Sequence, residues 1–331
     1  MGSHDLTLVL ARRDIERLIG MPAVLRVVER AFVAQARGAT SMPPKVYLNL
    51  PGGADFRAMP AYLAHPAACG MKWVNVHPRN GSKGLPTVMA VVVINDPATG
   101  FPLAVLEGSL ITRLRTAAAA GVATKHLARR DARVLALIGC GAQALDQVRA
   151  VAAVRRLREV RVWGYRRGEA ARFCARARRQ LAIPLRPVGS VREAVTHADV
   201  ITTITISRRP LVRRAWVAPG THINAIGADA PGKQELDARL LRDGVVVIDE
   251  CRQAIHGGEI NVPIRKGQFS PRQIRGTLGE VILGRARGRR GARDITIFDS
   301  TGLAIHDVAL GHELDRLARR RRVGRSIDLL V

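Results

Sequence analysis

The feature that most constrains the fold is a short apolar run that leads directly into a glycine-rich turn. Residues 133–138 read RVLALI, residues 139–144 read GCGAQA, and a helical pattern follows. A run of this length that is apolar in all but its first residue, Arg133, is typical of a buried parallel strand. In a GxGxxA turn the first glycine bends the chain, the second lets backbone amides approach a pyrophosphate, and the small third residue lets helix and strand pack closely. We therefore predict a dinucleotide-binding loop with contacts from Gly139, Gly141, Ala142 and Gln143.

The chain after this loop continues to alternate between strand and helix patterns. We predict strands at residues 159–163, 200–204, 221–226, 245–249 and 295–299, with helices at residues 168–181 and 191–197. Such alternation is typical of a parallel, doubly wound sheet of the Rossmann type. The predicted fold class is therefore α/β.

The end of the second strand of this sheet bears on the choice of dinucleotide. An acidic residue at this position would accept a hydrogen bond from the ribose 2′-hydroxyl of NAD. This chain instead has Gly164, Tyr165, Arg166 and Arg167. Guanidinium groups suit a 2′-phosphate, so NADP(H) is favoured. NAD(H) stays open, because two arginines are also ordinary surface residues in a chain this rich in arginine.

The first part of the chain has a different pattern, which predicts an α+β region with a mostly antiparallel sheet. Residues 6–36 have apolar positions at helical spacing, and short strands are predicted at residues 46–50, 70–76 and 87–95. Further helices are predicted at residues 109–127 and 306–322. We place the domain boundaries so that residues 1–117 with 308–331 form one domain and residues 118–307 form the Rossmann domain.

Charge and composition narrow the range of partners. The formal net charge is +26, but arginines occur in nearly every segment and aromatic residues make up only 4%. A nucleic-acid module usually shows a compact basic stripe or interleaved aromatics, so we expect no specific nucleic-acid partner. No apolar stretch is long enough to span a membrane, which predicts a soluble protein.

Cysteine and histidine spacing indicates neither disulfides nor a metal. The four cysteines form no CxxC pair and the nine histidines form no HxxxH spacing, so we expect reduced thiols, a cytoplasmic location and no metal. The opening Met1-Gly2-Ser3-His4 lacks the pattern of a signal peptide and is interpreted as the remnant of an expression tag.

Cationic residues recur in the first region, at Lys45, Arg57, Lys72 and Arg115. Lys72 lies inside an apolar strand pattern, where a cation is costly unless it is paired or used. The alternative is a lysine on an edge strand that reaches solvent.

Several ordered motifs make the chain resemble the ornithine cyclodeaminase and mu-crystallin family, including its archaeal-type alanine dehydrogenases and its imine or ketimine reductases. The motifs are MPAY at residues 59–62, GMKWVNVHPRN at 70–80, NDPATGFPLA at 95–104, LRTAA at 114–118, GADAPGKQEL at 227–236 and FDSTGL at 298–303.

The resemblance implies roles for individual residues. Lys72 would be the active-site lysine, Arg115 would clamp the substrate carboxylate, and Asp229 would be the acid/base. It also implies cofactor contacts from Thr203, Ser207, Ser300, Thr301 and Gly302. The first domain would bind substrate and form a homodimer.

Two departures from the family pattern bear on the substrate. Arg57 stands where ornithine cyclodeaminases are expected to have an acid that holds the distal amine, and Lys45 stands where an arginine is common. Both cations suit a carboxylate, and Arg57 would repel an amine. We therefore predict an NAD(P)-dependent oxidoreductase that acts on the CH–NH bond of an amino acid or its imine. Two alternatives stay open: an ornithine or lysine cyclodeaminase with bound NAD, and an NADPH-dependent binding protein like mu-crystallin.

Overall fold

The computed structural model of the chain describes residues 6–329, so the interpretation of Met1–His4 as a tag remnant lies outside the described residues. The chain divides into two compact units, unit 1 (Met1–Arg115 with Leu303–Val331) and unit 2 (Thr116–Gly302). The divisions therefore fall at 115/116 and 302/303, where the sequence predicted 117/118 and 307/308. The second difference brings the start of the last helix, including Asp307, into unit 1.

Unit 1 is built on one eight-stranded sheet. Its strands are β1 (Thr7–Leu10), β2 (Thr40–Ser41), β3 (Val46–Asn49), β4 (Asp55–Ala64), β5 (Ala67–Val76), β6 (Val88–Asn95), β7 (Pro102–Glu107) and β16 (Arg325–Ile327). Their order is β16-β1-β7-β6-β5-β4-β2, and β3 pairs with β4. Only the β1–β7 pair among these is parallel, so the sheet is mostly antiparallel, as predicted.

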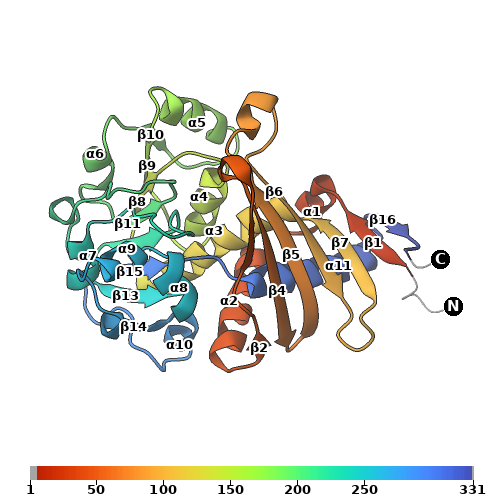
Figure 1. Cartoon of the computed structure of the whole chain (residues 1–331). Helices are drawn as coiled ribbons and strands as arrows, with labels where there is room; N and C mark the ends of the chain where they lie inside the picture. The colour runs from red at the N-terminus through yellow and green to blue at the C-terminus, as the bar shows by residue number, and fades with distance from the viewer. Residues whose placement is uncertain (1–5, 330–331) are drawn as a thin grey trace. The chain divides into compact units, whose positions relative to one another are not determined.

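One face of this sheet forms the core of unit 1. The helices are α1 (Arg12–Leu18), α2 (Met21–Ala36), the start of α3 (Gly108–Leu127) and α11 (Ala304–Arg321). The last of these packs on β4, β5, β6 and α2 (Figure 1). Strand register places Met59, Lys72, Val92 and Leu106 in one row across the sheet, and all four are buried. Lys72 therefore occupies a core position in a row of apolar side chains.

The prediction of a helix over residues 6–36 was wrong at its start. Thr7–Leu10 forms β1, which pairs in parallel with β7 and antiparallel with β16, and the helical part is broken between α1 and α2 near Gly20. The partners of β1 come from distant parts of the chain, so local spacing does not reveal them. A four-residue apolar run next to a helix also reads as part of that helix.

Unit 2 is a parallel sheet flanked by helices. Its strands are β8 (Val134–Ile138), β9 (Glu159–Trp163), β10 (Leu185–Pro187), β11 (Val200–Thr203), β12 (His222–Ala225), β13 (Val245–Ile248), β14 (Ile274–Thr277) and β15 (Thr296–Asp299). They lie in the order β10-β9-β8-β11-β12-β15-β13-β14, and every pairing is parallel. The predicted Rossmann-type α/β fold is confirmed.

The helices of unit 2 alternate with these strands along the chain. They are the rest of α3, α4 (Ala144–Ala152), α5 (Glu169–Ala177), α6 (Val191–Val195), α7 (Ala238–Asp243), α8 (Cys251–Gly257), α9 (Asn261–Arg265) and α10 (Leu278–Ile282). All five residues of β8 are buried, which is why its sequence is apolar throughout. The glycine loop leaves its carboxyl end and begins α4.

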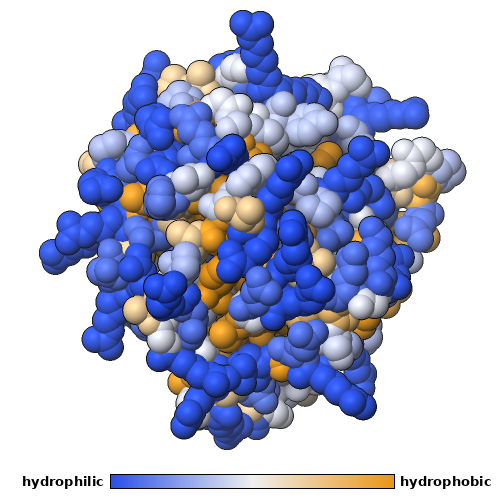
Figure 2. Space-filling model, turned by 90° about the vertical axis from the view of Figure 1, so that its left-hand side faces the viewer, coloured by the Kyte–Doolittle hydropathy of each residue, from blue (hydrophilic) through white to orange (hydrophobic). Residues whose placement is uncertain are grey.

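The surface agrees with the dispersed charge of the sequence. Figure 2 shows one face, on which hydrophilic side chains spread over the whole view and apolar atoms form only small patches between them. Among residues 6–329 no helix is both long and apolar enough to cross a membrane. Within the same range, no group of three or more His, Cys, Asp or Glu side chains is arranged to hold a metal ion. The four cysteines are free thiols.

Candidate functional site

The glycine loop of unit 2 shows two different reasons for its glycines. Gly139 has a φ of 106°, and a Cβ on it would lie 2.7 Å from the carbonyl oxygen of Ile204, so the protein itself requires glycine there. A Cβ on Gly141 would meet no atom within 4 Å. The fold therefore does not explain this second glycine, whereas a ligand that approaches the backbone does.

The same loop presents hydrogen-bond donors and acceptors that the described chain does not use. The backbone amides of Gly141, Ala142 and Gln143 precede α4 and have no acceptor among residues 6–329. Oε1 of Gln143 is buried and likewise without a partner there. Free amides at a helix start are a ready-made anion site, and β8 lies where the strand order reverses, with β9 on one side and β11 on the other. These features fit the pyrophosphate of a dinucleotide.

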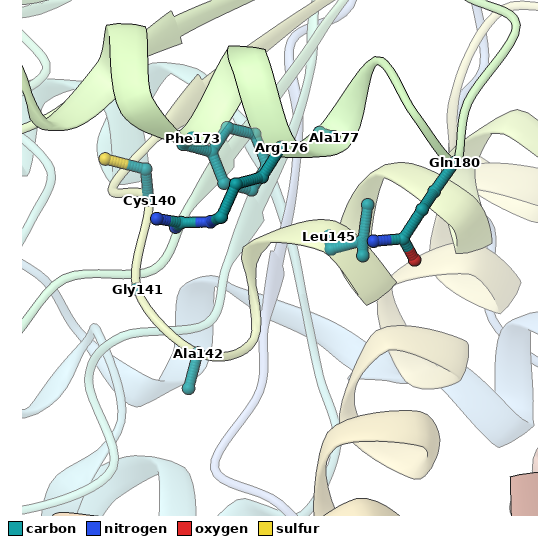
Figure 3. Close-up of a pocket in the computed structure, with 8 residues that line it drawn as sticks. All are labelled: Cys140, Gly141, Ala142, Leu145, Phe173, Arg176, Ala177 and Gln180. Carbon is teal, nitrogen blue, oxygen red and sulfur yellow. The ribbon is translucent and has the colours of Figure 1, made fainter. Parts of the chain in front are cut away.

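A pocket of about 390 Å³ lies beside this loop, between α4 and α5 (Figure 3). The side chain of Arg176 extends along it from α5 toward Cys140 and Gly141. Burial and the nearby Glu169 carboxylate raise the pKa of the Cys140 thiol to about 12, so this thiol stays protonated and unreactive at neutral pH. The remaining lining residues are Ala142, Leu145, Phe173, Ala177 and Gln180.

The loop after β9 lies against the glycine loop. A Cβ on Gly164 would lie 2.6 Å from Sγ of Cys140, so the close approach of the two loops requires glycine here. Tyr165 is 81% exposed, and Arg166 and Arg167 are exposed as well. Glu169, in the first turn of α5, accepts a hydrogen bond from the backbone N–H of Arg166 at 3.2 Å.

The segment Ser300, Thr301 and Gly302 is fixed by one buried carboxylate. Asp249, which follows β13, accepts hydrogen bonds from the backbone N–H groups of Thr301 at 2.6 Å and Gly302 at 2.9 Å. It also accepts one from the Thr301 hydroxyl at 3.0 Å. The chain itself therefore holds these backbone groups in place at the carboxyl end of β15.

Three further carboxylates, all fully buried, connect the loops at this end of the sheet. Glu235 accepts from the backbone N–H of Thr205 at 2.7 Å and of Gly227 at 2.9 Å. Glu259 accepts from the N–H groups of Glu235 and Leu236 at 2.9 and 2.7 Å. Asp299 in turn accepts from the N–H of Glu259 at 2.9 Å.

Burial dominates the titration of this group. It raises the pKa of Asp299 to about 8 and the pKa of Glu259 well above its usual 4.5. Sequence reasoning did not single out these three acids, although Glu235 and Asp299 lie within two of the quoted motifs. No local signal marks them as buried.

Two other predicted cofactor residues lie at the end of β11 and shortly after it. Thr203 ends β11 and is fully buried. The Ser207 hydroxyl donates to the carbonyl oxygen of Arg209 at 2.7 Å, closing a local turn. Their contacts with a cofactor stay predictions.

Asp229 lies in unit 2, in the loop after β12. Its carboxylate forms an ion pair with Lys233 four residues later, and the Asp229 side chain is 35% exposed. Lys233 also donates to the carbonyl oxygen of Gly227 at 3.4 Å. The carboxylate is therefore held by the loop while still reached by solvent.

In unit 1 the structure brings Lys72 and Arg115 together on a single carboxylate. Nζ of Lys72 lies 2.8 Å from Oδ2 of Asp307, and Nε of Arg115 lies 3.0 Å from Oδ1. The Asp307 side chain has no exposed surface, and the other two are almost completely buried. Within the described residues, the two terminal nitrogens of Arg115 make no hydrogen bond, so they stay available to an anion.

Burial changes the titration of this cluster. Loss of hydration, followed by the nearby Arg115 charge, lowers the pKa of Lys72 from 10.5 to about 7, although Asp307 opposes the shift. Burial also lowers the pKa of His306 to about 3, so this imidazole is neutral. His306 packs edge-on against Phe32, with ring centroids 4.4 Å apart. The cluster thus holds a lysine able to gain or lose a proton at neutral pH.

The other two predicted substrate residues lie nearby on unit 1. Arg57 makes a two-pronged contact with Asp55, with Nε to Oδ1 at 2.7 Å and Nη2 to Oδ2 at 3.1 Å. Its guanidinium also lies over the Tyr47 ring, 5.2 Å from the centroid. Lys45 precedes β3, and its charge contributes to the lowered pKa of Lys72.

Asp307 is the functional residue that sequence reasoning missed. It follows the FDSTGL motif and was treated only as the start of a helix. Its partner Arg115 is 192 residues away in the chain, so no spacing rule connects them. The available signal was the need of a buried Lys72 for a counter-charge.

Comparison with known proteins decides the family. The model described as "Ornithine cyclodeaminase/mu-crystallin family" matches residues 6–315. The chain belongs to this family. The resemblance stated from the sequence motifs is thereby confirmed.

Three individual comparisons illustrate the similarity. The chain is 47% identical to an alanine dehydrogenase of Archaeoglobus fulgidus, over 97% of this chain and 98% of that protein. The structure of an archaeal alanine dehydrogenase dimer with bound NAD has 46% identity and a TM-score of 0.93, covering 98% of this chain and all of the other. The Thermococcus litoralis Δ1-pyrroline-2-carboxylate reductase, solved with NADH and L-proline, has 36% identity and a TM-score of 0.94, over 97% and 100% of the two chains.

Proposed function

We propose that this chain interconverts a small α-amino acid and its α-imino acid, with the substrate carboxylate bound by Arg115 and the nitrogen served by Lys72. The broader statement, an NAD(P)-dependent oxidoreductase acting on an amino acid or its imine, follows from the family and from its dehydrogenase and reductase relatives. The prediction from sequence is confirmed at that level. The substrate and the residue roles are the proposal.

One observation carries the proposal: Lys72 and Arg115 share the single carboxylate of Asp307. Two buried cations on one anion leave a surplus of positive charge when Lys72 is protonated. Arg115 donates to Asp307 only through Nε, so its terminal nitrogens can form the paired bonds that a planar carboxylate accepts. A substrate carboxylate would therefore complete the charge balance of the cluster.

Lys72 can move the proton that the reaction requires. Reduction of an imine adds a hydride to the carbon and a proton to the nitrogen, and oxidation of an amine removes both. With its pKa lowered to about 7, Lys72 exists in both protonation states at neutral pH. It can thus donate a proton to an imine nitrogen or accept one from an amine.

Unit 2 supplies the features that suit a dinucleotide. When bound, a nicotinamide dinucleotide supplies the hydride in reduction and accepts it in oxidation. The free amides of Gly141, Ala142 and Gln143 would hold its pyrophosphate. We assign Asp229, which is ion-paired with Lys233, to proton exchange with water or substrate.

A steady-state assay tests this function directly. Wild-type protein is mixed with NADH or NADPH and with pyruvate plus ammonium, or with cyclic imino acids such as Δ1-pyrroline-2-carboxylate. We expect cofactor oxidation with at least one of them and a loss of about a hundredfold in kcat/KM for Lys72→Ala, the scale of general acid–base catalysis. Ammonia release from ornithine with no net change in cofactor would instead identify a cyclodeaminase. Tight cofactor binding with no turnover would identify a binding protein.

We further propose that NADP(H) is preferred over NAD(H). Gly164 replaces the expected acid, and Arg166 and Arg167 are exposed beside it. Arg176 offers a third guanidinium on the adjoining pocket. Loss of a charge-assisted contact corresponds to about tenfold or more in affinity. Replacing Arg166 and Arg167 together by Ala should therefore lower kcat/KM for NADPH by about that factor while leaving NADH unchanged. A wild-type preference for NADH would overturn this assignment.

We propose that the chain forms a homodimer through the outer face of the unit 1 sheet. Trp73 and Val91 are cross-strand neighbours on that face and are 37% and 43% exposed, and Tyr62 and Leu48 share it. An apolar sheet face of this kind is typical of a protein interface. The archaeal alanine dehydrogenase relative is described as a dimer. In sedimentation equilibrium, Trp73→Glu with Val91→Glu should give monomers, while Tyr165→Glu, an exposed aromatic on unit 2, should leave the dimer intact.

A further inference from the structure

The pairing of Arg57 with Asp55 lies on the same face of the unit 1 sheet as Lys72. In the β4–β5 register Arg57 stands opposite Val74 and Met59 stands opposite Lys72, which makes Arg57 a diagonal neighbour of Lys72. Diagonal neighbours on one face lie about 7–8 Å apart, within reach of long side chains. The Arg57–Asp55 pair therefore borders the Lys72–Asp307–Arg115 cluster.

The geometry of the pair shows that Asp55 holds and neutralises this guanidinium. Two bonds of 2.7 and 3.1 Å form the parallel fork with which arginine binds a carboxylate. The side chains of Arg57 and Asp55 are only 11% and 17% exposed, so solvent screens the pair weakly. Tyr47 on β3 is the cross-strand partner of Arg57 on β4, and its ring covers the guanidinium face. The fork that a second substrate carboxylate would use is already occupied.

The Lys72–Arg115 position and the Arg57 position thus differ in net charge. Lys72 and Arg115 share one acid between them, whereas Arg57 has an acid of its own. A carboxylate gains charge complementarity at the first position. At the second position, the Arg57–Asp55 pair has no net charge to attract a carboxylate, and the Asp55 oxygens repel it.

We propose that Asp55 is a specificity-determining residue that restricts the substrate to one carboxylate, by neutralising Arg57 beside the Lys72 cluster. The substrate is then an amino or imino acid that carries a single carboxylate. This inference rests on the proposed function for its reacting substrates. It makes a separate prediction about binding that needs no turnover.

Asp55→Asn tests the inference because it removes the charge but keeps an oxygen that can accept one bond from Arg57. The binding probes are L-lactate and L-malate, which differ only in a second carboxylate, measured by calorimetry on the protein with bound dinucleotide. Wild type should bind malate no more tightly than lactate. Asp55→Asn should bind malate about tenfold more tightly, with lactate changed by less than about twofold.

Two controls separate charge from structure. Asp55→Glu restores the charge and should restore the wild-type ratio. Glu159→Gln alters another strand acid paired with an arginine two residues later, Arg161 at 2.9 Å in unit 2, and should leave the ratio unchanged. Adding Arg57→Gln to Asp55→Asn should abolish the gain for malate.

An unchanged malate-to-lactate ratio in Asp55→Asn, or a wild type that already prefers malate, would overturn the inference. Turnover distinguishes this failure from that of the proposed function. Suppose that wild type reduces pyruvate with ammonium, but that Asp55→Asn does not raise the turnover of oxaloacetate with ammonium relative to that of pyruvate. The specificity assignment is then wrong and the function stands. If neither protein turns over any substrate but the binding ratio shifts, the function is wrong and the charge effect stands.

Discussion

Nζ of Lys72 lies 2.8 Å from Oδ2 of Asp307, in a place where neither side chain has more than 1% of its surface exposed. Arg115 reaches the other oxygen of the same carboxylate. A charge buried this deeply is tolerated only with a partner. Asp307 therefore determines both the position of the two cations and how much free energy their burial costs.

Asp307→Asn should strongly destabilise the protein, because Lys72 and Arg115 would stay buried without a counter-charge. Removing one partner of a buried ion pair costs about 3–5 kcal/mol of unfolding free energy. Denaturant unfolding measures this loss. The control is Glu313→Gln on the same helix, whose pair with Arg316 is partly exposed and should contribute at most about 1 kcal/mol. Similar losses in the two variants would contradict the role given to Asp307.

The pH dependence of the reaction should follow Lys72. Because its pKa in the fold is about 7, imine reduction should slow as pH rises through 7, and amine oxidation should accelerate over the same interval. Lys72→Arg keeps a cation that does not titrate and should remove both inflections. Asp307 raises the pKa of Lys72, so any active Asp307→Asn protein should show its inflection at lower pH. Profiles of kcat/KM in both directions, in buffers of constant ionic strength, provide the measurement.

Stability should respond to the same group with a defined sign. The unfolded lysine titrates near 10.5 and the folded one near 7, so between these values the unfolded chain binds more protons. The Lys72 contribution to the free energy of unfolding therefore rises with pH across this window. Lys72→Met should flatten that rise, as seen in urea midpoints at pH 6 to 10; an equal slope in the variant would rule out the shifted pKa.

The two glycines of the dinucleotide loop should behave in opposite ways. Gly141→Ala adds a methyl group to open space, so the unfolding free energy should stay within about 0.5 kcal/mol of wild type. Its KM for the dinucleotide should nevertheless rise about tenfold, because the methyl group occupies the approach to the backbone amides. Gly139→Ala should lose stability, since its φ of 106° and the nearby Ile204 oxygen exclude a side chain. Unchanged cofactor binding in Gly141→Ala would show that the ligand does not approach there.

Glu259 offers a matched pair of variants for the buried carboxylates. Its Oε1 accepts from both Glu235 N–H and Leu236 N–H, and a glutamine oxygen can do the same. Glu259→Gln should therefore fold well, while Glu259→Ala should lose about 1–3 kcal/mol for the amides left unpaired.

The pKa of Glu259 is raised in the fold, so its contribution to stability is greatest at low pH and is lost as pH rises through the folded value. Glu259→Gln should remove that loss. Thermal melts from pH 5 to 9 test this: a slope identical to wild type would mean that Glu259 stays ionised.

The Rossmann unit could be predicted from sequence because its signals are local. The buried strand β8, the GCGAQA turn and the helix after it are consecutive, so spacing alone reveals them. The first strand of unit 1 could not be predicted in this way. Thr7–Leu10 becomes a strand only through pairing with β7 and β16, and its four residues carry too little pattern to exclude a helix.

The same difference between local and long-range signals applies to the candidate site. Lys72 was identifiable because a cation in an apolar strand demands an explanation, but its partner Asp307 arrives by tertiary packing. The Asp55–Arg57 pair was within reach, since residues two apart on a strand share a face. Reading Arg57 as a cation without its neighbour overlooked that signal. Glu235, Glu259 and Asp299 could not be distinguished from ordinary surface acids, because burial is a property of the whole fold.

The long separation of Asp307 from Lys72 and Arg115 along the chain has a consequence for biosynthesis. The polypeptide leaves the ribosome from its N-terminus, and domains generally fold as units once complete. Lys72 and Arg115 are made early, yet their carboxylate and the helix that covers their sheet come from α11, and strand β16 comes later still. During translation the nascent first region must therefore keep two cations hydrated, and the part of the sheet face that α11 covers unburied, until residues 304–321 have been made.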